Sequence, residues 1–172
     1  SDALKLYASM ILSIDEGVGD IQKVLKEKNI KENTLIIFLS DNGPAKTTFK
    51  GLPKEWPRGE LLGSTAGLRG NKGKYTEGGI RVPFIMTWPN KLKQKAVYEG
   101  PVVSIDIYPT LSKIAGLKLP QNETFEGIDI MEFVFPKFTQ MTRDEIIWCG
   151  SRGAEKNGAI RKGDWKLIFN DR

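Results

Sequence analysis

Histidine is absent from this sequence, and cysteine occurs once. Without histidine among the 172 residues, the chain contains no imidazole general base, no imidazole metal ligand and no histidine-dependent triad. The single cysteine, Cys149, excludes an internal disulfide and a cysteine-rich zinc site. Because it follows the apolar residues 146–148, we expect it to be packed in the core. Any chemistry in this chain therefore depends on carboxylates, amides, lysines and arginines.

Long apolar segments are also missing. No stretch approaches the ~20 apolar residues of a membrane helix, and no signal peptide is recognisable. The length suits one ordinary globular domain, and 40% hydrophobic residues suffice for its core. Lysine and arginine number 26 against 21 acidic residues, a net charge of +5. This mild excess is compatible with an anionic substrate but indicates no particular partner.

The first part of the chain predicts one long helix and one short strand. Apolar residues recur at spacings of three and four from Asp2 to about Lys28, which is typical of an amphipathic helix. Gly17 and Gly19 weaken its middle, and we expect them to mark close packing or a kink. Residues 35–39 are all apolar, as in a strand buried on both faces of a parallel sheet with flanking helices. The predicted fold class is therefore α/β, with a partial mixed or parallel sheet.

The remainder predicts a loop region, a second strand and helix unit, and a small β region. Residues 43–79 are rich in glycine and proline, and loops of that length are usually functional or disordered. Strands are expected at 81–89 and 101–104, with a helix capped by Asp106 after them. Towards the C-terminus, short apolar runs separated by turn residues predict an antiparallel meander. We expect the α/β domain to span residues 1–130 and a small antiparallel subdomain to span residues 131–172.

Asp41 and Asn42 stand together at the end of the first predicted strand, in the sequence FLSDNGP. Ligands of open α/β sheets bind beyond the carboxyl ends of the strands. One carboxylate and one amide oxygen are ligands that Ca²⁺ or Mg²⁺ prefers, although two are too few for a complete site. The alternative is an Asx turn, in which either side chain accepts a backbone hydrogen bond from two residues on. The pattern alone leaves both interpretations open.

A basic, glycine-rich segment, GLRGNKGKYTEGGIRVP (residues 67–83), is the second candidate site. Its cations are Arg69, Lys72, Lys74 and Arg81. Glycines let backbone approach a ligand closely, and lysine or arginine neutralises an anion such as sulfate or phosphate. A mobile basic surface loop is the alternative, since the spacing is not that of a P-loop. Nucleic-acid binding is not predicted, because aromatic residues are not interleaved with these cations in the way that stacking platforms require. We expect the sheet to bring this segment close to the acidic strand end.

Taken together, several segments resemble one protein family. The ordered set NTLIIFLSDNG, LRGNKGKYTEGGIRVPFIMTWP, SIDIYPTLSKIAG and AIRKGDWKLI is similar to the C-terminal half of arylsulfatase-type sulfatases, in the alkaline phosphatase superfamily. The resemblance extends over nearly the whole chain. It implies an alkaline phosphatase-like α/β fold, hydrolysis of the sulfate ester of a small molecule or carbohydrate, and export to the periplasm or outside the cell.

The resemblance also implies roles for individual residues. Asp41 and Asn42 match ligands of the catalytic divalent cation, usually Ca²⁺, and Lys72 matches the lysine that contacts the substrate sulfate. We expect Arg81 to be structural, as an interior partner for an acid. For the complete enzyme the resemblance implies that a cation would activate a formylglycine hydrate for attack on sulfur, and that cationic side chains would stabilise the sulfuryl oxygens.

The family's other catalytic elements do not occur in this sequence. The C/S-x-P-x-R motif that yields formylglycine is missing, as are the paired aspartates, the second lysine and the histidines of the family's N-terminal half. We therefore expect a fragment of a longer or split protein that is inactive alone and self-associates through uncovered apolar surface. The alternatives are a phosphoesterase or phosphonate hydrolase of the same superfamily, and a noncatalytic module for sulfated-glycan binding or assembly.

Overall fold

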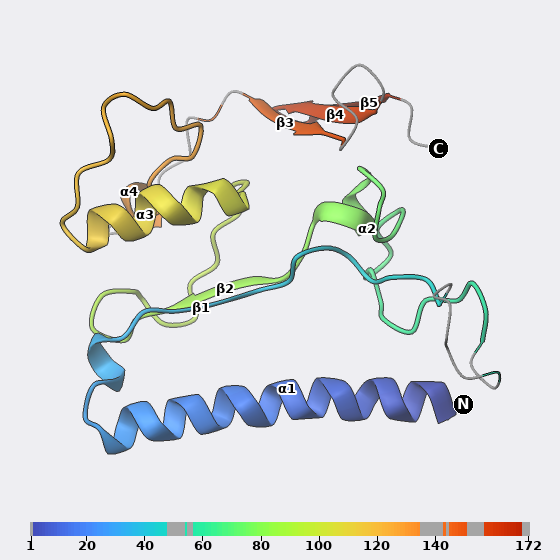
Figure 1. Ribbon diagram of the computed structural model, residues 1–172, viewed down its shortest axis with the longest axis horizontal. Coiled ribbons are helices and arrows are strands. Elements are labelled where there is room, and N and C mark those ends of the chain that lie inside the picture. The colour runs from blue at the N-terminus through green and yellow to red at the C-terminus, as the bar shows by residue number, and fades with distance from the viewer. Residues whose placement is uncertain are drawn as a thin grey trace. The chain divides into compact units, whose positions relative to one another are not determined.

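The computed structural model describes residues 2–47, 54, 57–134, 143, 145–150 and 157–169. The chain forms two compact units, one of Ser1–Thr87 with Asp144–Arg172 and the other of Trp88–Arg143. Figure 1 shows the helices and strands of both. No helix within these ranges combines the length and apolar character needed to cross a membrane. The boundary between residues 130 and 131 stays a prediction.

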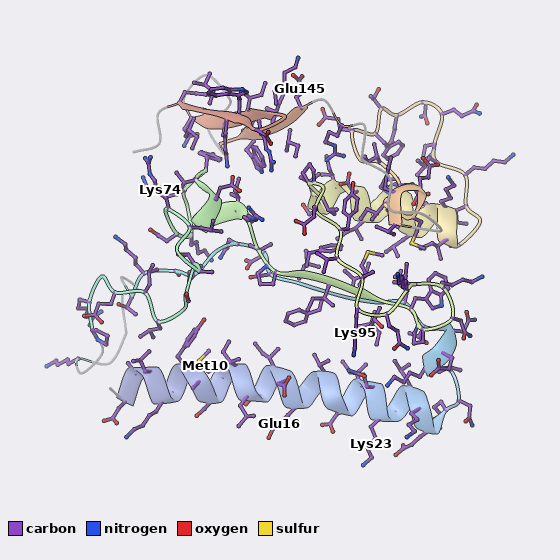
Figure 2. All side chains as sticks on the ribbon, turned by 180° about the vertical axis from the view of Figure 1, so that it is seen from behind. Met10, Glu16, Lys23, Lys74, Lys95 and Glu145 are labelled. Atoms are coloured by element: carbon purple, nitrogen blue, oxygen red, sulfur yellow. The ribbon has the colours of Figure 1, made fainter. Side chains whose placement is uncertain are left out.

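The first unit begins with a long helix, α1, Asp2–Glu27, where the apolar spacing predicts one. Ala3 is buried, and Tyr7, Val18 and Leu25, which share its side of the helix, are half-buried. Met10 lies on one side of α1 and Glu16 and Lys23 on the other (Figure 2). The helix is thus amphipathic, as expected.

Gly17 and Gly19 do not mark close packing in α1. A Cβ atom added at either position would meet nothing within 4 Å, and the helix continues through both. The expectation of a tight contact was therefore wrong for the part of the chain that the structure describes. The two glycines weaken the helix without a packing reason in this unit.

A short 3₁₀ helix, Lys31–Asn33, joins α1 to β1, Ile36–Leu39. β1 pairs with β2, Phe84–Thr87, and the two strands run antiparallel with Leu39 opposite Phe84. The apolar run predicted a parallel neighbour, but β2, the partner that β1 meets among the described residues, is antiparallel to it.

Burial on both faces of β1 was also wrong for the described residues. Phe38 and Leu39 are 41% and 36% exposed, and the sheet that contains them has two strands. A two-stranded sheet covers little of its own surface. The apolar composition of β1 shows that the strand suits burial on both faces. The rest of the described chain does not cover both of them.

The C-terminal part of the first unit is the predicted antiparallel meander. It consists of β3, Glu145–Cys149, β4, Gly158–Lys162, and β5, Trp165–Phe169, in that order across the sheet. Lys162 lies opposite Trp165, so the β4–β5 hairpin has a two-residue loop. Gly163 in that loop has φ 55°, which suits a tight hairpin turn.

The two faces of this sheet differ in burial. Ile146 and Ala159 are buried on one face, whereas Ile147 and Leu167, on the other, are 57% and 65% exposed. Cys149 lies on the same face as Ile147 because side chains two apart share a face, and it is exposed with a free thiol. Our expectation that Cys149 is packed in the core was wrong.

In the second unit, a 3₁₀ helix, Ser104–Asp106, leads into α3, Ile107–Ile114, and α4, Met131–Val134, follows later. Residues 101–103, where we expected a strand, have no regular structure. The fully buried Asp106 carboxylate accepts hydrogen bonds from the N–H groups of Val103 (2.9 Å) and Ile128 (3.0 Å), and it pairs with Arg143. Asp106 therefore joins distant segments instead of capping α3 with its side chain.

Candidate functional site

The turn that follows β1 carries Asp41 and Asn42. Ser40 Oγ donates a hydrogen bond to the carbonyl oxygen of Asn42 (3.0 Å), and the Asn42 side-chain amide donates to the carbonyl of Gly43 (2.8 Å). Asp41 is exposed and Asn42 half-buried. No described residue donates a hydrogen bond to a side-chain oxygen of either residue, so the Asx-turn alternative is not formed.

Two backbone hydrogen bonds join this turn to residues 67–80, hereafter the glycine loop. Gly43 N–H donates to the carbonyl of Gly79 (2.8 Å), and Lys72 N–H donates to the carbonyl of Pro44 (3.0 Å). A Cβ atom at Gly43 would lie 1.9 Å from the Gly78 carbonyl oxygen. The structure therefore brings the acidic strand end and the Lys72 segment into direct backbone contact.

The glycine loop is also tightly folded on itself. It ends in one helical turn, α2, Glu77–Ile80, whose Gly78 N–H donates to the carbonyl of Arg69 (2.8 Å). Gly70 and Gly73 have φ values of 94° and 87°, which glycine adopts more readily than any other residue. Much of the glycine content thus serves the fold of the loop, in addition to any approach of a ligand.

Lys72 is held by its backbone, while its side chain reaches the surface. The residue is exposed, and its ammonium makes no ion pair or hydrogen bond with any residue that the structure describes. Lys74, two residues on, lies on the same loop (Figure 2). The structure thus places an exposed lysine in a segment whose backbone is hydrogen-bonded next to a turn that carries one carboxylate and one amide.

Arg81 was expected to be an interior partner for an acid, and this expectation was wrong. Arg81 is exposed, and its guanidinium pairs with no acid in the described ranges, although its N–H donates to the carbonyl of Glu77 (2.7 Å). The Glu77 carboxylate instead accepts a hydrogen bond from Lys166 Nζ (2.7 Å) on β5.

Lys166 is the residue near this site that sequence reasoning missed. Its ammonium lies 2.7 Å from Glu77 Oε1 and 4.8 Å from the centre of the Trp148 ring. The sequence separation of 89 residues leaves no local signal of the ion pair. The available signal was the alternation in WKLIF, which places Lys166 on the same face of the sheet as Ala159, the buried face.

A complete metal centre is not present in the described part of the chain. No group of three or more histidine, cysteine, aspartate or glutamate residues there is arranged to hold a metal ion. Asp41 and Asn42 offer two oxygen ligands, and Ca²⁺ takes about six to eight. The roles of Asp41, Asn42 and Lys72 therefore remain predictions.

Two sequence profiles match the chain and overlap in its centre. The sulfatase profile matches residues 2–117, and the profile of the C-terminal region of N-sulphoglucosamine sulphohydrolase matches residues 71–170. Steryl-sulfatase of Mus musculus is 35% identical over 126 residues, which are 73% of this chain and 19% of that protein. Arylsulfatase A of Homo sapiens is 30% identical over 165 residues, 95% of this chain and 30% of that protein.

Solved structures show the same likeness in three dimensions. The crystal structure of Ps i-CgsB matches with a TM-score of 0.80 and 32% identity, over 96% of this chain and 34% of that one. This match confirms the expected alkaline phosphatase-like α/β class. The chain spans about a fifth to a third of the length of the relatives named here. Since the sulfatase profile alone covers more than half of it, the chain belongs to the sulfatase family.

Proposed function

We propose that this chain contributes part of the active site of a sulfuric ester hydrolase, in which Lys72 binds the sulfate group of the substrate. The observation that carries the proposal is the hydrogen bond from Lys72 N–H to the Pro44 carbonyl (3.0 Å). This bond ties the backbone of Lys72 to the segment that carries Asp41 and Asn42. The Lys72 ammonium is exposed and unpaired among the described residues. An ammonium in this state can donate charge-assisted hydrogen bonds to sulfuryl oxygens.

We further propose that Asp41 and Asn42 supply two ligands of a Ca²⁺ or Mg²⁺ site. Their donor chemistry fits, since a carboxylate and an amide oxygen are hard ligands and neither accepts a hydrogen bond from a described residue. The remaining ligands would lie outside the described residues. When bound, such a cation supplies positive charge that stabilises an anionic nucleophile and the oxygens of the substrate.

The formylglycine nucleophile is also proposed to lie outside this chain, because no C/S-x-P-x-R motif occurs in the sequence. We therefore expect the 172-residue chain by itself to leave an aryl sulfate unhydrolysed, as measured by release of the phenol. Turnover by the purified chain that K72A abolishes would contradict this expectation.

Carbohydrate sulfates are the substrate class that we propose. The structure of Ps i-CgsB in complex with k-i-k-neocarrahexaose, which matches 94% of this chain with a TM-score of 0.78 and 32% identity, supports a carbohydrate ligand. Export to the periplasm or outside the cell, implied by the family resemblance, is part of the same proposal.

Sulfate binding by the chain itself tests the role of Lys72. Sodium sulfate is titrated at constant ionic strength, and amide chemical shifts are followed in wild type and in K72A. We expect the shifts to centre on the glycine loop, and we expect K72A to weaken affinity about tenfold or more, as loss of a charge-assisted hydrogen bond does. K118A, an exposed lysine in the second unit, is the control with the same change of charge. Equal affinity in K72A and K118A would overturn the assignment.

Calcium binding tests the role of the turn separately. Titration with calcium chloride is expected to shift the amides of residues 40–43 in wild type. D41N keeps the shape of the side chain but removes its charge, and we expect it to abolish these shifts. D20N, at an exposed position in α1, should bind as wild type does. Identical titrations of D41N and D20N would contradict the proposed metal ligand.

A further inference from the structure

We infer that Lys166 is a positioning residue, which holds the glycine loop so that Lys72 and the Asp41–Asn42 turn keep their mutual arrangement. This inference rests on the proposed function of Lys72 as a sulfate ligand. Lys166 lies on β5, far in sequence from both segments, and its described side-chain contacts are with Glu77 and Trp148, not with Lys72. It acts through Glu77.

The ion pair between Lys166 and Glu77 is sheltered from solvent. The Lys166 side chain is 14% exposed and the Glu77 side chain 33%, so water and salt screen the pair less than a fully exposed pair. The ammonium also lies over the Trp148 ring, 4.8 Å from its centre, where the ring attracts a cation. Carboxylate and ring together define where the ammonium sits.

Backbone hydrogen bonds connect Glu77 to both proposed functional segments. Glu77 is the first residue of α2, and the carbonyl of Gly79 in the same turn accepts the N–H of Gly43, which directly follows Asn42. The next residue, Pro44, accepts the N–H of Lys72. A movement of α2 would therefore displace the acceptor that holds the Asp41–Asn42 turn, and with it the anchor of Lys72.

A second contact joins the glycine loop to the sheet of β3, β4 and β5. Gly150 follows β3, and a Cβ atom there would lie 2.9 Å from the Tyr75 hydroxyl oxygen. Gly150 N–H donates to the carbonyl of Asn157 (3.0 Å), which continues the β3–β4 pairing. Figure 1 shows α2 next to this sheet, in agreement with the ion pair. The sheet thus supports the loop at two places, Glu77 and Tyr75.

Removal of the Lys166 charge should loosen the loop without unfolding the sheet. The three strands are held by their own backbone ladders, which do not depend on the ammonium. Without Lys166, the Glu77 carboxylate can turn towards Arg81, four residues along the chain, a spacing that suits an ion pair in a helical turn. Such a change of partner would move the first residue of α2.

The test uses the full chain and two readouts, amide hydrogen exchange and sulfate titration. In K166M, exchange at the Gly43 and Gly78 amides should become about tenfold faster, as loss of a hydrogen bond between charged groups predicts. Sulfate affinity should fall severalfold, while the thermal midpoint of unfolding stays close to that of wild type. K166R, which keeps the cation, should restore both readouts. K162M, which removes an exposed lysine of β4, should change neither.

E77Q removes the carboxylate of the same ion pair, and exchange at Gly43 and Gly78 should become faster in this variant too. It tests the inference if K166M fails to fold. Unchanged exchange at Gly43 and Gly78 in both variants would overturn the inference, and so would faster exchange with unchanged sulfate affinity. If K72A binds sulfate as wild type does, the proposed function fails instead. The two failures are distinct, because exchange at Gly43 and Gly78 is measured without sulfate.

Discussion

At the scale of single residues, Gly43 shows how closely two backbone segments approach at the candidate site. A Cβ atom there would lie 1.9 Å from the carbonyl oxygen of Gly78 and 2.9 Å from its carbonyl carbon. Both neighbours are backbone atoms, which cannot rotate away as the end of a side chain can. The glycine in the sequence SDNG is therefore required by packing, whatever the turn binds.

G43A should lower the free energy of unfolding by roughly 1–3 kcal/mol, because overpacking forces the turn away from the glycine loop. Urea denaturation of wild type and variant measures this difference. The amides of residues 70–74 should shift as well, since Lys72 is anchored to the neighbouring Pro44. Wild-type stability in G43A would show that the turn relaxes without strain and would contradict the prediction.

Lys113 in α3 provides a residue-scale prediction of pH dependence. Its hydrogen bond with Glu132, and secondly that with Asp129 (3.2 Å), raise the pKa of Lys113 above its ordinary value of 10.5. A raised lysine pKa means that the folded state favours the charged form. The pair therefore contributes stability below pH 10.5, and this contribution is lost as pH rises through the folded pKa.

E132Q should lower the pKa of Lys113 towards 10.5, because it removes the carboxylate that contributes most to the shift. Titration of the Lys113 side-chain resonances by NMR measures this pKa directly. E123Q changes an exposed glutamate outside the pair and is the control. The same Lys113 pKa in wild type, E132Q and E123Q would show that the ion pair does not persist in solution.

At the scale of elements, α1 combines a regular helix with two glycines that touch nothing. Gly17 lies in the interior of the helix, and a Cβ atom there would have no neighbour within 4 Å. G17A should therefore raise the free energy of unfolding by about 0.5–1 kcal/mol, through better helix propensity alone. Urea denaturation of G17A and G43A in parallel tests both predictions, since the free energy of unfolding should rise in G17A and fall in G43A. A destabilised G17A would mean that this position packs against another surface in solution.

At the scale of the whole molecule, apolar side chains remain uncovered among the described residues. On α1 alone, several large apolar residues are about half exposed: Leu6, Met10, Ile14, Ile21 and Val24. Patches of this kind are unusual on a monomeric soluble protein and favour association. Self-association of the chain stays a prediction, and these exposed side chains are the reason to test it.

The molar mass of the chain, measured by light scattering, should rise with concentration in the micromolar range. M10K and I21K place charges on the apolar face of α1 and should shift the equilibrium towards the monomer. L117K, at a residue that is 66% exposed in the second unit, should have a smaller effect. A clean monomer at all these concentrations would contradict the prediction.

Local patterns in the sequence were sufficient for several features of this protein. The spacing of apolar residues predicted α1, and short runs between turn residues predicted the meander of β3, β4 and β5. Residue chemistry at a strand end and in a glycine-rich segment indicated Asp41, Asn42 and a group of four cations, and the family resemblance then selected Lys72 among those cations. The predictions of α1 and of the meander are confirmed, and the site residues could be proposed, because periodicity and side-chain chemistry are properties of neighbouring residues.

The tertiary structure alone decided what depends on contacts between distant residues. It determined that β2 runs antiparallel to β1, that Cys149 is exposed, and that Glu77 pairs with Lys166 instead of Arg81. The pairing of Glu77 is the clearest case, since Arg81 is four residues away and Lys166 is 89. A carboxylate pairs with the cation that the fold brings closest to it and shelters from water. The number of residues between the two in the sequence does not show which cation that is.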